Sequence, residues 1–272
     1  MPKFTTSDGL SLHYTDEGNG LPILCLAGLS RNGSDFDYVA PHLTDHRLIR
    51  LDYRGRGQSD WDDNWRNYTL PIECRDVIEL LDHLKLDAAA IIGTSRGGLN
   101  AMGIAAAAPD RILGVALNDI GPELDPKGLV GVMDYLGRKP NANTHEDMAA
   151  AIEHIVVGFD NVPKSRWMEE ARKHFPDDGN GLNLTYDPKL RDAVEAGGDI
   201  LDLWPFFDAL AGKPLCCLRG AGSDLLSSET LTKMQTRRPD MITATITDRG
   251  HIPFLDEPAS LKALNTWIGT MA

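Results

Sequence analysis

Basic residues, aromatic residues and cysteines are all scarce in this 272-residue sequence, and it holds no long apolar run. Lysine and arginine number 27 against 40 aspartates and glutamates, which gives a formal net charge of −13, and the basic residues form no block. Such a charge repels polyanions, which argues against nucleic acid or an anionic membrane as a partner. No stretch approaches the length of a membrane span, and no apolar signal core follows Met1. We therefore expect a cytoplasmic protein.

The few cysteines also narrow the possibilities. All four lie inside apolar patterns, and two of them are adjacent, which prevents a good mutual disulfide and gives no metal-ligand spacing. They are typical of buried thiols in a reducing compartment, and we expect no metal site. The four are Cys25, Cys74, Cys216 and Cys217.

Short apolar runs alternate with helical patterns through the first 122 residues, which predicts a mostly parallel sheet flanked by helices. The alternation stops at residue 123 and resumes at residue 198. We therefore expect an α/β core formed by residues 1–122 and 198–272, and a helical insertion formed by residues 123–197. The predicted strands lie at 22–26, 47–51, 88–93, 112–117, 214–218 and 241–247, after a hairpin within 3–16, and the predicted helices lie at 36–43, 69–84, 96–108, 201–210 and 257–271.

Ser95 is the candidate nucleophile. It lies between glycines where an apolar strand meets an Ala-rich helix, and small neighbours are needed there because the two backbones approach closely. The Gly-x-Ser-x-Gly pattern also occurs in ordinary turns, so the rest of the chain must decide between the two interpretations.

A serine hydroxyl needs a base, and the base needs an acid that orients it. Of the eight histidines, only His251 follows the last predicted strand, and Gly250 before it permits a tight turn. For the acid we expect Asp224, which follows a buried strand and preserves the order Ser, Asp, His. Asp119 also ends a strand and is the alternative acid.

The oxyanion of an acyl-transfer reaction needs two fixed N–H donors. The Arg96 N–H at the predicted helix start is one candidate. The Leu29 N–H, directly after Gly28, is the other, although Ala27-Gly28-Leu29 is equally compatible with an ordinary strand-to-helix turn.

Taken together, these motifs resemble the α/β-hydrolase superfamily over nearly the whole chain outside the insertion. The resemblance implies an eight-stranded sheet, a helical cap inserted after the sixth strand, and a Ser95, Asp224, His251 triad without a cofactor. It is carried by Ala27-Gly28-Leu29, Asp52-x-Arg54-Gly55-x-Gly57-x-Ser59, Gly93-Thr94-Ser95-Arg96-Gly97-Gly98 and Gly250-His251-x-Pro253-Phe254-x-x-Glu257-Pro258.

Two residues depart from the usual pattern of that superfamily. Ala27 stands where a histidine is usual, so any contact made by that imidazole is absent. Arg96 is larger and more basic than the usual residue after the nucleophile. Its side chain either lines the pocket floor and favours an anionic substrate, or pairs with a carboxylate such as Asp119.

The expected function is hydrolysis of a small or medium carboxylic ester through an acyl-enzyme. A serine nucleophile argues against the related haloalkane dehalogenases and epoxide hydrolases, which attack through aspartate. A carbon–carbon bond hydrolase, a lactonase and a ligand sensor with little turnover remain alternatives. We expect a small ester-like molecule as the partner and a monomer or homodimer, with Gly28, Trp167, Trp204 and Phe207 lining the substrate pocket.

Overall fold

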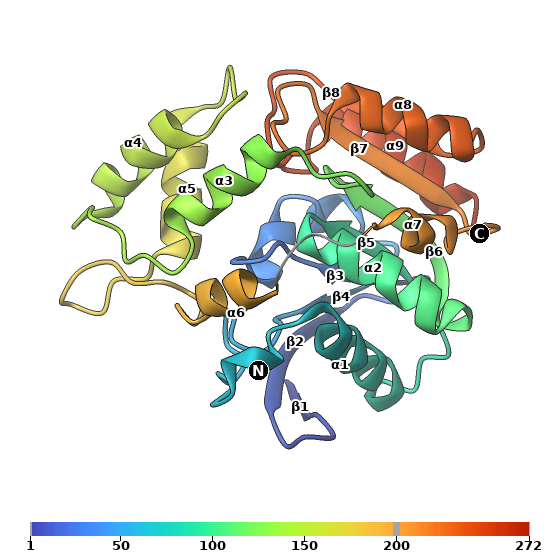
Figure 1. Cartoon of the computed structure of the whole chain (residues 1–272), viewed down its shortest axis with the longest axis horizontal. Coiled ribbons are helices and arrows are strands. Elements are labelled where there is room, and N and C mark those ends of the chain that lie inside the picture. The colour runs from blue at the N-terminus through green and yellow to red at the C-terminus, as the bar shows by residue number, and fades with distance from the viewer. Residues whose placement is uncertain (1, 198–201, 272) are drawn as a thin grey trace.

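In the computed structural model, which describes residues 2–197 and 202–271, one sheet of eight strands runs through the molecule (Figure 1). β1 and β2 pair antiparallel, β2 pairs antiparallel with β4, and every later pairing is parallel. The predicted fold class is confirmed. In the order β1-β2-β4-β3-β5-β6-β7-β8 the strands are β1 Lys3–Thr5, β2 Ser11–Glu17, β4 Arg47–Leu51, β3 Pro22–Leu26, β5 Ala89–Thr94, β6 Ile112–Asn118, β7 Leu215–Gly220 and β8 Ile242–Ile246.

The central strands bury both faces of the sheet, as their continuous apolar runs predict. Successive side chains of a strand point to opposite faces. Leu24 and Leu26 of β3 accordingly join a core with α1 Leu70–His83, α2 Arg96–Ala107, α7 Trp204–Asp208 and α8 Ser228–Arg237. Ile23 and Cys25 join a second core with α9 Pro258–Gly269 on the other face.

The segment 36–43 was expected to form one helix, and this expectation is wrong. It forms parts of two 3₁₀ turns, η1 Gly33–Asp37 and η2 Ala40–His42. Pro41 has no N–H to donate, so a continuous helical ladder cannot run through it. Two further 3₁₀ turns are η3 Trp65–Asn67 and η4 Pro109–Arg111.

Five helices of the described ranges lie between β6 and β7, and in Figure 1 the first four, α3 to α6, lie together to one side of the sheet. The loops at the carboxyl ends of β7 and β8 pack against this segment. A Cβ on Gly222 would meet the Gly158 backbone, and one on Gly250 would meet the Val157 carbonyl. These first four helices are α3 Pro126–Tyr135, α4 His145–Ile155, α5 Lys164–His174 and α6 Leu190–Ala196, here named the cap helices. The predicted boundary after residue 197 adjoins residues 198–201, which lie outside the described part.

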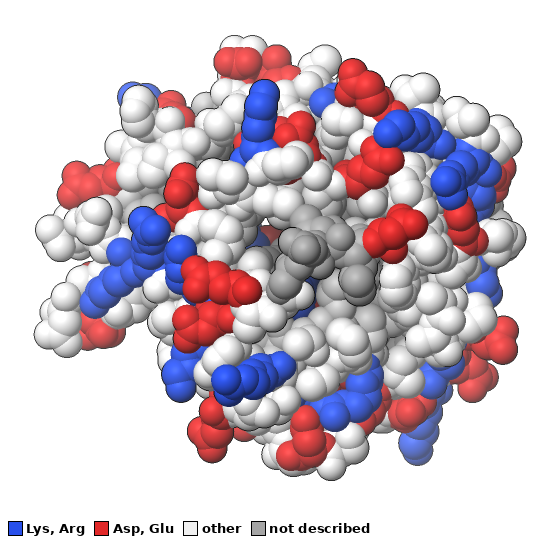
Figure 2. Space-filling model, in the orientation of Figure 1, with Lys and Arg blue, Asp and Glu red and all other residues white. Residues whose placement is uncertain are grey.

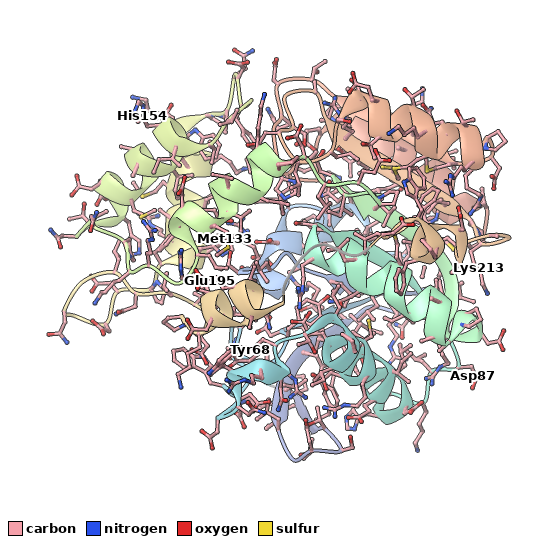
Figure 3. All side chains as sticks on the ribbon, in the orientation of Figure 1. Tyr68, Asp87, Met133, His154, Glu195 and Lys213 are labelled. Carbon is pink, nitrogen blue, oxygen red and sulfur yellow. The ribbon has the colours of Figure 1, made fainter. Side chains whose placement is uncertain are left out.

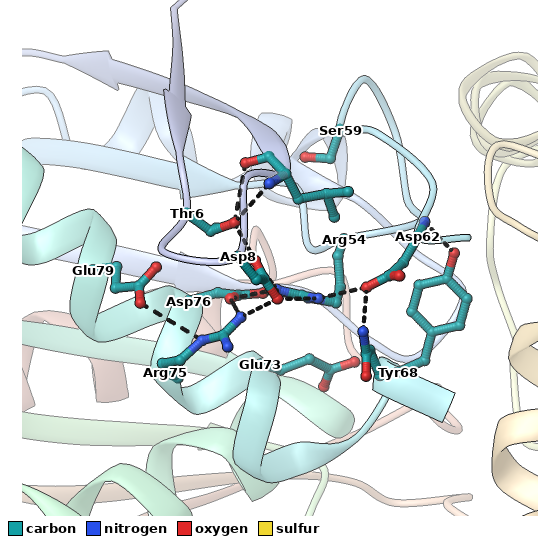
Figure 4. Close-up of polar contacts among 12 residues, drawn as sticks. Thr6, Asp8, Arg54, Ser59, Asp62, Tyr68, Glu73, Arg75, Asp76 and Glu79 are labelled. Carbon is teal, nitrogen blue, oxygen red and sulfur yellow. Dashed lines mark hydrogen bonds and ion pairs between the residues drawn. The ribbon is translucent and has the colours of Figure 1, made fainter. Parts of the chain in front are cut away.

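A buried ion cluster joins the turn after β1 to α1 (Figure 4). The fully buried Arg54 donates to both carboxylate oxygens of Asp76 at 2.6 and 2.7 Å, and to Asp62 at 2.6 Å. Asp8 accepts from Arg54 at 3.1 Å and from Arg75 at 2.6 Å. Removing one member would leave an unpaired buried charge, which typically costs about 3–5 kcal/mol. The Arg54 position of the glycine-rich turn therefore has a structural role.

All four cysteines are free thiols. Burial raises the pKa of Cys74 and of Cys216 to about 12, so neither is a reactive thiolate near neutral pH.

Acidic and basic side chains are interspersed on the face shown in Figure 2. Among the helices of the described ranges, none combines the length and apolar character that a membrane span requires.

Candidate active site

Ser95 lies at the turn between β5 and α2 with φ 50° and ψ −115°, an unfavourable backbone conformation for a residue other than glycine. The turn brings backbones so close that side chains are excluded around it. A Cβ on Gly93 would lie 2.6 Å from the Gly97 carbonyl oxygen, and one on Gly97 would lie 1.9 Å from the Leu26 carbonyl oxygen. These contacts explain the glycines of the motif, and the turn raises Ser95 above the carboxyl end of the sheet.

His251 reaches Ser95 from the loop after β8. Its Nε2 lies 3.1 Å from Ser95 Oγ, and its Nδ1 lies 2.7 Å from Asp119 Oδ2. A carboxylate on Nδ1 favours the tautomer that carries the proton there, which leaves Nε2 free to accept a proton from the serine.

The acid beside His251 is Asp119 and not Asp224, so the expected assignment is corrected. Asp119 follows β6 directly, is fully buried and has φ 55°. Its Oδ1 accepts from the Gly220 N–H at 2.8 Å, and its Oδ2 accepts from Ser223 Oγ at 2.6 Å. The loop after β7 therefore orients the acid instead of supplying it.

Asp224 has a different place in the same loop. Its carbonyl accepts from the Gly128 N–H in α3 at 3.1 Å, which ties a cap helix to the core. Within the described ranges its side chain makes no hydrogen bond. Ser223, the residue before it, is the one whose side chain contacts Asp119.

The two predicted oxyanion donors lie on either side of the nucleophile. The Arg96 N–H begins α2, and in the described structure neither it nor the Leu29 N–H has a hydrogen-bond partner. The loop around Leu29 is fixed twice: the Gly28 carbonyl accepts from the Arg31 N–H at 3.2 Å, and the Leu29 carbonyl accepts from Arg56 Nε at 2.9 Å.

One buried carboxylate connects these two sides. Glu73 on α1 accepts from Arg96 Nε at 2.8 Å, and Arg56 Nη2 lies 2.9 Å away, off the hydrogen-bond direction. Asn100 donates to the same carboxylate at 3.2 Å. Burial alone would raise the pKa of Glu73, but Arg96 and Arg56 outweigh it and lower the pKa to about 2.

This arrangement shows whether the Arg96 side chain lines the pocket floor or pairs with a carboxylate. Of the two alternatives, pairing with a carboxylate is the one observed, with Glu73 in place of Asp119 as the partner. The Arg96 guanidinium is thereby directed into the protein, and Tyr68 provides a carbonyl for it at 3.4 Å.

The four predicted pocket residues lie in different surroundings in the structure. Gly28 lies beside the nucleophile, since a Cβ on it would be 3.8 Å from the Ser95 Cβ. Trp167 packs against Phe159 of the cap segment and against Phe254 of the loop that carries His251. Trp204 is half-buried and donates from its indole N–H to Glu123 at 2.9 Å. Phe207 is fully buried in the core, so it has no open surface for a pocket wall.

Leu29 packs instead against a cluster that includes residues of α3. Met133 and Val132 of α3 contact the cluster around Tyr68 and Tyr186, with Leu29 at its edge. Figure 3 labels Met133 on α3 and His154 on α4, where His154 is exposed.

His13 is occupied elsewhere, with its Nδ1 2.9 Å from Asp52. In residues 2–197 and 202–271, no three His, Cys, Asp or Glu side chains come together in a way that would hold a metal ion.

The sheet, the serine turn and the histidine loop together define a hydrolase of the α/β type, and comparison with known proteins gives the family. The sequence profile of the alpha/beta hydrolase family matches residues 23–264, so the chain belongs to that family. A 3-hydroxybutyrate-oligomer hydrolase of Cupriavidus necator is 34% identical over 261 residues, which cover 91% of this chain and 88% of the relative. An esterase of Escherichia coli is 26% identical over 266 residues, 93% of this chain and 95% of the relative.

A solved structure supports the same family. The alpha/beta hydrolase of Novosphingobium aromaticivorans is 37% identical, covers 98% of this chain and 97% of its own, and superposes with a TM-score of 0.92. These relatives and the fold identify the protein as a hydrolase.

Proposed function

We propose that this protein is a serine-dependent carboxylic ester hydrolase. The observation that carries the proposal is the continuous Ser95–His251–Asp119 chain, with separations of 3.1 and 2.7 Å. Relatives that are an esterase and a 3-hydroxybutyrate-oligomer hydrolase favour oxygen esters, short hydroxy-acid oligomers included, as the substrate class.

In the proposed reaction, Ser95 Oγ attacks the ester carbonyl while its proton passes to Nε2 of His251. Asp119 stabilises the imidazolium, and because it is buried it does so in a low dielectric. The Leu29 and Arg96 amides donate to the oxyanion of the tetrahedral intermediate.

His251 then gives the proton to the departing alcohol, which leaves Ser95 acylated. A water molecule, deprotonated by the same imidazole, attacks the acyl carbon and releases the carboxylic acid. The proton returns to Ser95 through His251, so the enzyme is regenerated.

The test is turnover of short p-nitrophenyl esters by Ser95→Ala, compared with the native protein. Loss of turnover with an unchanged thermal transition is expected. Unchanged turnover would refute the proposal.

The choice of substrate distinguishes an ester hydrolase from a carbon–carbon bond hydrolase. An enol-dione ring-cleavage product, supplied beside simple esters, is expected to remain uncleaved. Negligible turnover across an ester panel, together with a ligand-dependent rise in melting temperature, would favour a sensor instead.

A further inference from the structure

Arg31 is a second cationic residue beside the nucleophile, and the proposed ester hydrolysis does not account for it. It lies two residues after Leu29, and its side chain and that of Ser95 both lie next to Gly28. A Cβ on Gly28 would be 3.3 Å from Arg31 Cγ and 3.8 Å from Ser95 Cβ. The aliphatic part of the Arg31 side chain therefore lies near the reacting serine.

Two buried carboxylates fix one edge of this guanidinium. Nε donates to both oxygens of Asp35 at 3.0 Å, and Nη2 donates to Glu170 on the cap helix α5. Both carboxylate side chains are 5% exposed. Burial alone would lower the pKa of Arg31, but Asp35 and Glu170 outweigh it and raise the pKa above its ordinary value.

Those carboxylates have partners besides Arg31. Tyr38 donates to Glu170 at 3.0 Å, and His174 Nε2 lies 3.1 Å from Asp35 and 3.5 Å from Glu170. The cluster therefore holds Arg31 in one orientation, which reduces the entropy that it loses on binding a ligand.

The other edge of the guanidinium is open. Nη1 makes no hydrogen bond to any residue of the described ranges, and 30% of the Arg31 side chain is exposed. Arg96, by contrast, is 14% exposed and directed at Glu73. Of the two arginines, Arg31 is therefore the more exposed, and its Nη1 is available to a ligand.

Arg31 also acts on the cap residue Tyr135, which is 49% exposed. Burial raises the pKa of the Tyr135 phenol, Arg31 and Ser30 lower it, and Asp224 and Asp35 raise it. Tyr135 of the cap and Arg31 of the Leu29 loop are therefore neighbours.

We propose that Arg31 binds a carboxylate of the substrate, so that the preferred substrates are esters with a free carboxyl group a few bonds from the ester carbonyl. A fixed guanidinium with an open N–H edge is suited to a carboxylate, and a charge-assisted hydrogen bond of this kind is stronger than one to a neutral oxygen. The inference rests on the proposed ester hydrolysis and adds the substrate's charge and the residue that recognises it.

The experiment compares two substrates that differ only in this charge, 3-acetoxybutyrate and 3-acetoxybutyramide. Both acetylate Ser95, so the ratio of their kcat/KM values reports the leaving group alone. The native protein is expected to favour the anion by about ten- to a hundredfold, as for a hydrogen bond to a charged group.

The variant Arg31→Met/Glu170→Gln removes the guanidinium without leaving an extra buried negative charge, because His174 remains beside Asp35. Its substrate ratio is expected to fall close to one. Arg31→Lys keeps the positive charge but lacks the planar pair of guanidinium N–H donors, so its ratio is expected to lie between those of the native protein and the double variant. Arg31→Lys replaces the double variant if the double variant fails to fold. Lys173→Met is the matched control. Lys173 lies on α5, like Glu170, but pairs with Asp37, so its substitution should leave the ratio unchanged.

The outcomes are distinct. Native protein that cleaves both substrates without preference, or an anion preference that persists in the double variant, overturns the role of Arg31 and leaves ester hydrolysis intact. Native protein that cleaves neither substrate overturns the proposed hydrolysis as well.

Discussion

Nδ1 of His251 lies 2.7 Å from Oδ2 of Asp119, across a separation of 132 residues in the chain. The same carboxylate is held by the Gly220 N–H and by the Ser223 hydroxyl. This contact fixes which of the two candidate acids serves the histidine, and it leads to the first prediction.

Asp119→Asn is expected to lower kcat for p-nitrophenyl esters by about a thousand- to ten-thousandfold, because an amide on Nδ1 no longer favours the productive tautomer. Asp224→Asn is the matched control and is expected to retain kcat close to the native value. Steady-state kinetics on both variants checks this, and a larger loss in Asp224→Asn than in Asp119→Asn would contradict it.

Glu73→Gln is expected to lower kcat by about ten- to a hundredfold with little change in KM, since Arg96 and Arg56 then lose the carboxylate that aligns both sides of the oxyanion site. Affinity for a boronic acid, which mimics the tetrahedral intermediate, should fall by a similar factor. If Glu73 had only a structural role, its substitution would not weaken boronic-acid binding while leaving KM unchanged.

Asp76→Asn provides the control for this effect. Asp76 is also a buried acid on α1 paired with a buried arginine, but its cluster faces the turn after β1 (Figure 4). The variant should lower the melting temperature and leave kcat unchanged. A fall in kcat equal to that of Glu73→Gln would mean that both residues act only through stability.

Glu73 also predicts a pH dependence of stability. Its pKa in the folded protein is lowered from 4.5 to about 2, so folding favours the charged form. This contribution is fully present above pH 4.5 and is lost as the pH falls toward 2. Denaturant unfolding across that range should show a shallower loss of stability in Glu73→Gln than in the native protein, and parallel curves would contradict the account.

Gly97→Ala is expected to reduce the free energy of unfolding by about 1–3 kcal/mol, because the new methyl group would overlap the Leu26 carbonyl and overpack the turn. Gly269→Ala introduces the same methyl group where nothing lies within 4 Å, and it should be neutral. Equal transition midpoints for the two variants in urea would show that the turn relaxes freely.

Much of the core was predictable from the sequence. Continuous apolar runs mark β3 at Pro22–Leu26 and β4 at Arg47–Leu51, where the predicted and observed limits agree. Ser95 and His251 were identifiable because each follows a buried strand in a glycine-containing turn, and the structure brings them together. Local pattern sufficed in these cases because the signal lies within a few residues.

The acid was not predictable in this way. Asp119 and Asp224 both follow buried strands, and the choice depends on the left-handed backbone at Asp119 and on the hydroxyl of Ser223. Neither feature leaves a mark in the sequence pattern.

Long-range ion pairs were equally inaccessible. Arg31 and Glu170 are 139 residues apart, and Arg96 and Glu73 are 23 apart on different helices. Phe207 was predicted to line the pocket but is buried in the core, because an aromatic residue near the junction between cap and core serves packing as readily as substrate binding.

The most direct test of the central claim is the site of covalent labelling by a fluorophosphonate, read by peptide mass mapping alongside residual esterase activity. One adduct per chain on the peptide that contains Ser95, with activity lost in proportion, is the predicted result. Full labelling with esterase activity retained, or an equal adduct in Ser95→Ala, would contradict the assignment of Ser95 as the nucleophile.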